Sequence, residues 1–246
     1  MSSPVLEISG VIKDYRGLRP LRVQELEVDA GEHVAVVGLD LPAAEIFVNL
    51  VTGATLPDQG QIRLRGRSTS SVSDAAAWLE FVDRFGIVSE RAVLLDAMSA
   101  LQNLAMPFSI DIEPLGGELL ERARTLARVV GLRDEDWERR VGDLDGPARL
   151  RVRLGRALAL DPDVVLLEHP SAGLARGDVE SIGREVRTRI ERRRAAGLEG
   201  TASLTLTADP DFAHAVAARV LLLDAASGRL RPRRRGWFFG RGARNQ

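Results

Sequence analysis

Residues 38–46, which read Gly-Leu-Asp-Leu-Pro-Ala-Ala-Glu-Ile, have the layout of a loop that holds phosphate. They follow a short apolar run, residues 33–37, and lead into a run with helical spacing, residues 43–52. A glycine between a strand and a helix start allows backbone amides to converge on an anion. However, Gly38 is the only glycine of the segment, and Glu45 places a negative charge inside it. The sole lysine of the chain is Lys13, so no lysine ammonium is available here.

A second candidate for chemistry is the pair Glu168–His169, which directly follows the apolar run 164–167. A carboxylate in this place could hold Mg²⁺, and the imidazole could act as a general base. The same two residues are equally consistent with a polar surface pair at the end of a strand. The pair therefore indicates a site without deciding its chemistry.

The elements that must position these residues alternate between strands and helices, which is typical of a parallel α/β core. We expect strands at 5–9, 21–28, 33–37, 61–64, 164–167, 203–207 and 220–224. We expect helices at 43–52, 147–160, 178–194 and 211–217. Turn signals near Gly17 and Pro20 separate the first two of these strands.

The middle of the chain, about 91–146, shows no clear strand and is predicted to be a helical insertion, with helices at 101–108, 117–130 and 134–140. Residues 1–230 then form one domain. Residues 231–246 form a basic and aromatic tail that contains Arg233–Arg235 and Trp237–Phe239. This tail is either a disordered terminus or a contact with an anionic membrane surface or a partner.

The composition excludes several classes of protein. A formal net charge of −1 gives no overall field that would draw the chain to nucleic acid, so no nucleic-acid partner is expected. The absence of cysteine excludes disulfides and thiolate metal sites. No secretory signal is recognisable, and no apolar run approaches the roughly 20 residues of a membrane-spanning helix. We therefore expect a cytoplasmic location and membrane contact only through a partner or a surface.

The order of elements up to about Leu230 resembles the nucleotide-binding subunit of ATP-binding-cassette (ABC) transporters. Three stretches carry the resemblance: GATLPDQGQIRLRG (53–66), LLDAMSALQNLAMPF (94–108) and LDGPARLRVRLGRALALDPDVVLLEHPSAGL (144–174). The likeness is closest to the branch that serves bacterial lipid-trafficking importers. It implies a P-loop NTPase-like parallel core with an N-terminal antiparallel β layer and a helical insertion, which is the ABC ATPase fold.

The phosphate loop departs from the family pattern G-x-x-G-x-G-K-[ST], in which glycine amides and a lysine hold the phosphates and a hydroxyl holds Mg²⁺. Gly38 matches, whereas Leu41 and Ala43 replace the next two glycines. Ala44 stands at the lysine position and Glu45 at the hydroxyl position, followed by Ile46. Loss of one charge-assisted hydrogen bond costs roughly 1.5–3 kcal/mol, about one to two decades of affinity.

Other family positions also differ. Glu168–His169 replaces an aspartate for Mg²⁺ and a catalytic glutamate, Glu90 replaces the glutamine that senses metal and water, and Ala208 replaces the switch histidine. Ala175 replaces the aspartate after the dimer-facing turn. At the signature, Asp145 and Pro147 replace the serine and the second glycine around Gly146. We therefore predict no catalytic residue, no bound cofactor and no metal, although weak binding of ATP with Mg²⁺ stays open.

Structural explanations exist for several of these residues. Asp145 is a good helix N-cap and Pro147 a good first-turn residue. Tyr15 matches the aromatic residue that stacks on adenine in the family, but a tyrosine in a β-rich region is also an ordinary packing residue. Glu90 is equally consistent with a loop carboxylate.

Three functions fit the resemblance, and we expect the first of them, with the other two as alternatives. The first is a subunit that has lost ATP hydrolysis and is retained to dock a membrane permease, as a homodimer or beside a second nucleotide-binding subunit, at the inner face of the membrane and with a lipid or other hydrophobic substrate. The second is a divergent but active ATPase. The third is a soluble regulator or adaptor. The predicted docking wall is 89–107, with Glu90, Val93, Leu94, Leu95 and Met98 as contacts.

Overall fold

The computed structural model describes residues 4–72, 74–192 and 200–233. The strands are β1 (Leu6–Lys13), β2 (Leu21–Val28), β3 (His33–Val37), β4 (Gln59–Leu64), β5 (Arg67–Ser68), β6 (Phe85–Val88), β7 (Val164–Glu168), β8 (Ala202–Thr207), β9 (Arg219–Leu223) and β10 (Leu230–Pro232). The helices are α1 (Leu41–Val51), α2 (Ala75–Val82), α3 (Ala100–Ala105), α4 (Gly117–Val130), α5 (Gly146–Leu158), α6 (Val179–Glu191) and α7 (Pro210–Val216). Single 3₁₀ turns lie at Thr69–Ser71, Asp134–Asp136 and Val141–Asp143.

Over the described ranges the strands form two sheets. An antiparallel sheet has the order β2-β1-β4-β5. The other sheet has the order β10-β9-β3-β8-β7-β6, and its pairs are parallel except for the antiparallel edge pair β9–β10. This arrangement confirms the predicted parallel core with an antiparallel layer. All five residues of β3 and of β7 are buried, as expected for strands covered on both faces.

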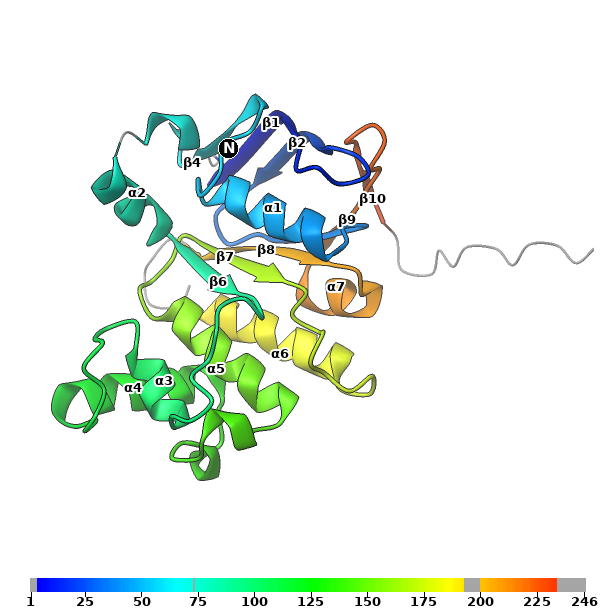
Figure 1. Cartoon of the computed structure of the whole chain (residues 1–246). Helices are drawn as coiled ribbons and strands as arrows, with labels where there is room; N and C mark the ends of the chain where they lie inside the picture. The colour runs from blue at the N-terminus through cyan, green and yellow to red at the C-terminus, as the bar shows by residue number, and fades with distance from the viewer. Residues whose placement is uncertain (1–3, 73, 193–199, 234–246) are drawn as a thin grey trace, which may run out of the picture.

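The parallel sheet has an apolar core on each face. On one face, α1 is packed between the parallel sheet and the antiparallel layer, as Figure 1 shows. On the other face lie α6 and α7. The helices α3, α4 and α5 lie on this face as well, and we call these three the helical unit. Alternate residues of β3 contribute to opposite cores, with Val34 and Val36 on the α1 side and Ala35 and Val37 on the other.

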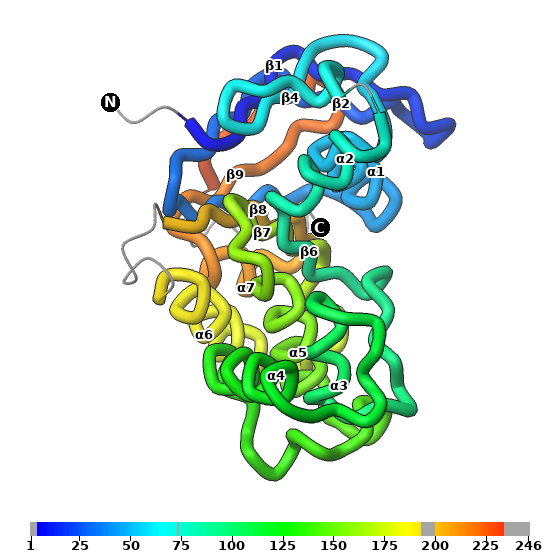
Figure 2. Tube along the Cα trace, turned by 90° about the vertical axis from the view of Figure 1, so that its left-hand side faces the viewer, coloured from blue at the N-terminus to red at the C-terminus, as the bar shows by residue number. Residues whose placement is uncertain are grey.

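The helical unit occupies the end of the molecule away from the antiparallel layer, which both views show (Figures 1 and 2). Helix α5 packs on α3 and α4 and also on β6, so it joins the helical unit to the sheet. The contact with β6 is close because a Cβ added at Gly86 would lie 2.2 Å from the carbonyl oxygen of Ala157. The structure thus needs glycine at this crossing of strand and helix.

Several predictions about elements need correction. The predicted helix 134–140 is only a 3₁₀ turn at Asp134–Asp136, because the chain then leaves the helical path to form a bridge between Arg140 and Ser99. Sequence analysis missed α2, β5, β6 and β10, which are short or lack a clear period. The segment assigned to a tail from residue 231 begins inside β10, and residues 234–246 lie outside the described ranges, as does the proposed membrane contact of that segment.

His33, the first residue of β3, gives a prediction about acid stability. The ring is 4% exposed, and its Nδ1 lies 2.7 Å from Ser203 Oγ on β8. Burial lowers the pKa of His33, the charge of Glu191 opposes this shift, and Arg187 lowers the pKa further. Because the folded-state pKa lies below the unfolded value of about 6.5, this histidine contributes stability above that pH. The contribution is lost as the pH falls through the folded-state pKa.

We expect His33→Asn, which can keep a hydrogen bond to Ser203, to lose less unfolding free energy than the wild type between pH 7 and pH 5. Urea titrations at several pH values measure the difference. Parallel pH profiles of wild type and His33→Asn would contradict the assignment.

Candidate functional site

The connection between β3 and α1 is shorter than a phosphate-binding loop of the predicted kind. Helix α1 begins at Leu41, so Ala44, Glu45 and Ile46 already lie on the helix together with Ala43. Only residues 38–40 connect the strand to the helix. Gly38 has a φ of 99°, which suits glycine and makes the sharp turn after β3.

The free amides at the start of α1 are largely used by the chain itself. The carboxylate of Asp40 caps the helix and accepts from the amide of Ala43 at 2.9 Å. The Asp40 carbonyl accepts from the amide of Ala44 at 2.9 Å, and Pro42 has no amide hydrogen. Of the first four residues of the helix, only Leu41 therefore retains an amide for another acceptor.

The side chains of Ala44 and Glu45 on α1 point in different directions, Ala44 into the core and Glu45 toward Arg91. Ala44, at the position of the family's lysine, is 0% exposed and belongs to the core between α1 and the sheets. The side chain of Glu45 is 46% exposed and reaches a different group, Arg91. A longer side chain at position 44 would therefore start inside the core, while position 45 faces the site.

Arg91 links the two carboxylates that the sequence placed in the site. Its Nε donates to both oxygens of Glu168 at 3.2 Å, and its Nη2 donates to Oε2 of Glu168 at 2.7 Å. Its Nη1 lies 3.4 Å from Glu45 Oε1. The hydrogen bonds with Glu168 raise the pKa of Arg91, and the charges of Glu168 and Glu45 add to this shift although burial opposes it. A guanidinium thus lies between the positions from which the family holds its metal ion.

Glu168 and His169 are adjacent in sequence but have different surroundings. The side chain of Glu168 is 6% exposed and is occupied by Arg91. His169 is 9% exposed, has a φ of 43°, and lies in the turn after β7, where its amide donates to the carbonyl of Leu206 at 2.8 Å. Its Nε2 has no hydrogen-bond partner among the described residues. Ala208 is exposed after β8, and its methyl group can neither donate nor accept a hydrogen bond.

Glu90 points away from this cluster. Its carboxylate lies 2.5 Å from Nη2 of Arg153 on α5, whose side chain is 8% exposed. Burial lowers the pKa of Arg153, and the charge of Glu90 opposes that shift. The residue at the family's glutamine position is therefore bound to the helical unit and not to Glu168.

The signature segment has the local structure that its residues predict. Asp145 caps α5 and accepts from the amide of Ala148 at 2.8 Å, and Pro147 lies in the first turn. Gly146 packs directly on the turn 171–174, because an added Cβ would lie 2.0 Å from the carbonyl oxygen of Gly173. These contacts agree with the structural explanation of Asp145 and Pro147.

Tyr15 and the loop after β3 share one hollow. It has a volume of about 580 Å³, and its lining includes Tyr15, Arg22, Gly38, Asp40 and Ala43. Burial raises the pKa of Tyr15, and the charge of Asp40 raises it further. The structure thus places Tyr15 and the loop on one hollow, where the loop contributes the acid Asp40.

The predicted docking wall is only partly available to a partner. Val93 is 67% exposed, Leu95 is 37% exposed, and Met98 is half-buried. Leu94 is 5% exposed and packs in the core of the helical unit, so its assignment as a contact is wrong. Sequence alternation could not reveal this, because the segment is neither a strand nor a helix.

A groove of about 340 Å³ lies beside this segment, between β6 and the helical unit. Residues from 85–87 line one wall, and Met106 and Pro107 lie on the other with Arg153, Arg156 and Leu160. Arg156 also donates to the carbonyl of Val93 at 2.7 Å, which holds the segment next to the groove. Of the predicted wall 89–107, Ala92, Met106 and Pro107 line this groove, and its arginines were not among the predicted contacts.

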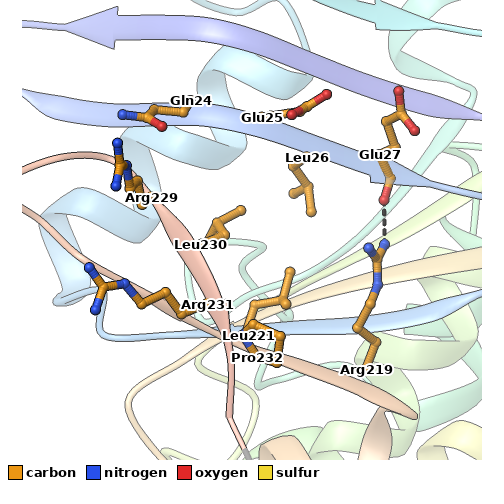
Figure 3. A pocket seen from close by; sticks show the side chains of 10 residues that line it. All are labelled: Gln24, Glu25, Leu26, Glu27, Arg219, Leu221, Arg229, Leu230, Arg231 and Pro232. Carbon is orange, nitrogen blue, oxygen red and sulfur yellow. Dashed lines mark hydrogen bonds between the residues drawn. The ribbon is translucent and has the colours of Figure 1, made fainter.

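A further hollow, of about 460 Å³, lies between β2 and the strands β9 and β10 (Figure 3). Figure 3 shows Arg219 donating to the backbone carbonyl of Glu27, and its Nε also lies 2.8 Å from Glu32. The lining contains the acidic residues Glu25 and Glu27 as well as Arg219, Arg229 and Arg231, so side chains of both charges line the hollow. No motif predicted it, and its mixed charges favour no single class of ligand.

The described residues contain neither a cluster suited to a metal ion nor a helix suited to a membrane span. Within 4–72, 74–192 and 200–233, no group of three or more histidine, aspartate or glutamate side chains is arranged to hold a metal ion. None of the helices in these ranges has the length and apolar character needed to cross a membrane.

Arg91 and Arg153 are the site residues that sequence analysis missed. The only signal was the dipeptide Glu90–Arg91 next to the expected glutamine position.

Comparison with known proteins places this geometry in a family. Residues 21–172 match the ABC transporter family model. The lipoprotein-releasing system ATP-binding protein LolD of Chromohalobacter salexigens is 34% identical over 174 residues, which cover 69% of this chain and 73% of LolD. The methionine import ATP-binding protein MetN of Brucella abortus is 28% identical over 226 residues, which cover 91% of this chain and 58% of MetN.

The fold is also shared with a solved structure. The dimeric structure of MJ0796, a bacterial ABC transporter cassette, aligns with a TM-score of 0.69 at 19% identity over 88% of this chain and 93% of that one. The family match spans more than half of the 246 residues, and the two-sheet architecture with its helical unit agrees with it. The chain therefore belongs to the ABC transporter family, as an ATP-binding-cassette subunit.

Proposed function

We propose that this subunit has lost ATP hydrolysis and is retained to dock a membrane permease and to dimerise. The observation that carries the proposal is Arg91, whose guanidinium is bound by Glu168 and lies 3.4 Å from Glu45. In phosphoryl transfer, positioning and neutralisation of phosphate charge supply nearly all of the catalysis. Here Arg91 is already neutralised by carboxylates, and an incoming triphosphate would meet the charge of Glu45.

The start of α1 supports the same proposal. A helix N-terminus attracts phosphate through its free amides and its positive end. The Asp40 carboxylate takes up both the amide of Ala43 and the positive potential of this helix end. The residues present therefore do not suit Mg-ATP, and we assign no reaction step to it.

The direct test is nucleotide binding and turnover by the purified chain. We expect no micromolar binding of Mg-ATP in isothermal titration, and we expect phosphate release that does not differ from that of His169→Ala. A working member of the family, such as a LolD-type relative, is the positive control. Micromolar binding would contradict the binding part of the proposal, and turnover abolished by His169→Ala would establish the alternative of a divergent active ATPase.

Docking is assigned to the groove beside β6, because its lining is largely apolar and exposed apolar side chains lie on it or next to it in the chain. Leu160 on its lining is 48% exposed, and Val93, which follows the lining residue Ala92, is 67% exposed. Isolated exposed apolar residues are ordinary, but those that adjoin a largely apolar groove mark an interaction surface. The permease would hold the subunit at the inner face of the membrane.

We expect affinity purification from the native membrane to recover a permease with membrane-spanning segments. Val93→Asp should reduce this recovery several-fold, whereas Leu18→Asp, at a fully exposed leucine on the antiparallel layer, should leave it unchanged. Recovery of soluble proteins alone would favour a regulator or adaptor instead. A second nucleotide-binding subunit in the preparation would indicate a heterodimer, and its absence a homodimer.

A lipid or another hydrophobic molecule is the proposed substrate class. Its support is the local sequence likeness and the relative LolD, the ATP-binding protein of a lipoprotein-releasing system. MetN, with a similar degree of likeness, is a methionine import ATP-binding protein. Lipids that co-purify with the permease complex, identified by mass spectrometry, are the measurement that decides this point.

A further inference from the structure

The dipeptide Glu90–Arg91 lies where the chain leaves β6 for the helical unit, and its two side chains bind different parts of the molecule. Glu90 pairs with Arg153 on α5, which belongs to the helical unit. Arg91 pairs with Glu168 at the end of β7 and with Glu45 on α1, which belong to the α/β core. Two adjacent charges of opposite sign thus connect the same point of the chain to both parts.

Each pair includes one buried charge that needs its partner. The side chain of Arg153 is 8% exposed, and that of Glu168 is 6% exposed. A buried charge without a partner is costly, whereas the partners Glu90 and Arg91 are 60% and 40% exposed and reach in from the surface. Rotation of the helical unit away from the core would stretch the Glu90–Arg153 pair, the Arg91–Glu168 pair, or both.

Further arginines of α5 hold the segment that follows. Arg149 pairs with Asp96 at 3.0 Å, and Arg156 donates to the carbonyl of Val93 at 2.7 Å. Together with Arg153, they lie at positions i, i+4 and i+7 of one helix and therefore share a face. The segment 90–96 is thus bound along α5, so the connection to the helical unit has little freedom except at its contact with the core.

We propose that Glu90–Arg91 is an ionic lock that fixes the orientation of the helical unit on the α/β core without any ligand. This goes beyond docking, because it concerns motion inside the subunit. A permease bound in the groove between β6 and the helical unit would meet two walls held at a constant angle. Mg-ATP would not change that angle, since the position of the metal ion is taken by Arg91.

The experiment uses the absence of cysteine from the chain. Gln61→Cys on β4 and Glu118→Cys on α4 place one exposed label site on each part of the full-length protein. Pulsed electron-electron double resonance between two spin labels then gives the distribution of distances between core and helical unit. We expect one narrow distribution in the otherwise native chain, and we expect it to be the same with and without Mg-ATP.

Lock variants should broaden that distribution or add a second maximum. Arg91→Gln and Glu90→Gln each remove one charge, and the double reversal Glu90→Arg with Arg153→Glu restores a pair of opposite charges. We expect both single variants to broaden the distribution and the reversal to narrow it again. Arg124→Gln, which removes an exposed ion pair within α4, is the matched control and should change nothing.

Circular dichroism and a cooperative melting transition establish that each labelled variant is folded. If Arg91→Gln does not fold, Glu90→Gln and the reversal decide the question alone, since Glu90 is largely exposed. A distribution that stays narrow in the folded lock variants would overturn the proposal. A broad distribution in the native chain, or a shift on addition of Mg-ATP, would overturn it as well. ATP turnover does not enter this readout, so the lock and the loss of hydrolysis can fail independently.

Discussion

Replacement of Ala44 by lysine is expected to lower the unfolding free energy by at least about 3 kcal/mol, through overpacking and burial of a charge. Ala44 is 0% exposed and packs in the core between α1 and the two sheets. The introduced ammonium would therefore begin in an apolar environment and would not lie at the mouth of a phosphate loop. We also expect no stabilisation of this variant by Mg-ATP. Urea titration with and without 5 mM Mg-ATP measures both effects.

Leu41→Lys is the matched control, because it adds the same side chain to an exposed position of the same helix. It should cost less than about 1 kcal/mol, which is the size of an unfavourable charge at a helix N-terminus. Near-native stability of Ala44→Lys together with a clear shift on addition of Mg-ATP would contradict the structure of this segment. It would mean that a single residue separates the loop from a working phosphate site.

The position of Ala44 illustrates what sequence can predict about this site. The strand, the glycine and the helix were all expected, and β3 and α1 lie where their apolar patterns indicate. The start of the helix was not, because it depends on the Asp40 cap, and a cap of this type is one of several roles an aspartate can have in a turn. A shift of two residues in the helix start decides which of its side chains face the core.

The fold was more predictable than the partners of charged residues. Buried strands such as β7 can be recognised in the sequence as continuous apolar runs, and in α5 and α6 the apolar residues recur with helical spacing. By contrast, β6 is only four residues long and α2 has apolar residues on most of its faces, so their patterns do not identify them. Propensity and periodicity describe local structure, and short elements are fixed by what they pack against.

Arg91 could not have been assigned from sequence for a related reason. An arginine in a loop can reach many carboxylates, and it is 77 positions from Glu168 and 46 from Glu45 in the chain. Only the fold brings the end of β7, the second turn of α1 and the exit of β6 to one place. The sequence did indicate that Glu45 and Glu168 share a site, which left open what cation would balance them.

The structure indicates which group compensates the negative charges of Glu45 and Glu168. In the family, a site with acidic residues gains its positive charge from a lysine and a metal ion. In this chain an acid is kept at position 168, a second acid, Glu45, stands where the family has a hydroxyl, and an internal guanidinium serves both of them. If this account is correct, Glu168 is the residue that depends on Arg91, because Glu168 is buried and Arg91 is partly exposed. The dependence can be measured directly.

Replacement of Arg91 by alanine is expected to cost about 2–4 kcal/mol of unfolding free energy. A broken buried ion pair costs about 3–5 kcal/mol, and the 40% exposure of Arg91 reduces that figure. Glu168→Gln should cost less than about 1 kcal/mol, because the amide oxygen can still accept from Arg91, whose charge has access to water. The double variant Arg91→Ala, Glu168→Gln should be nearly as stable as Glu168→Gln alone, since no buried charge remains.

We therefore expect a double-mutant cycle by urea titration to show that the losses of unfolding free energy do not add: Glu168→Gln should restore most of the stability that Arg91→Ala removes. The cycle of Arg124 and Glu121, an exposed pair on α4, is the control and should give a coupling below about 0.5 kcal/mol. Equal costs for Arg91→Ala and Glu168→Gln that simply add in the double variant would show that Glu168 does not rely on this cation. In that case the carboxylate would need another positive partner, and the case for a site closed by its own arginine would fail. A rescue would instead mean that the acidic residue at the family's Mg²⁺ position, Glu168, is kept here for an internal salt bridge.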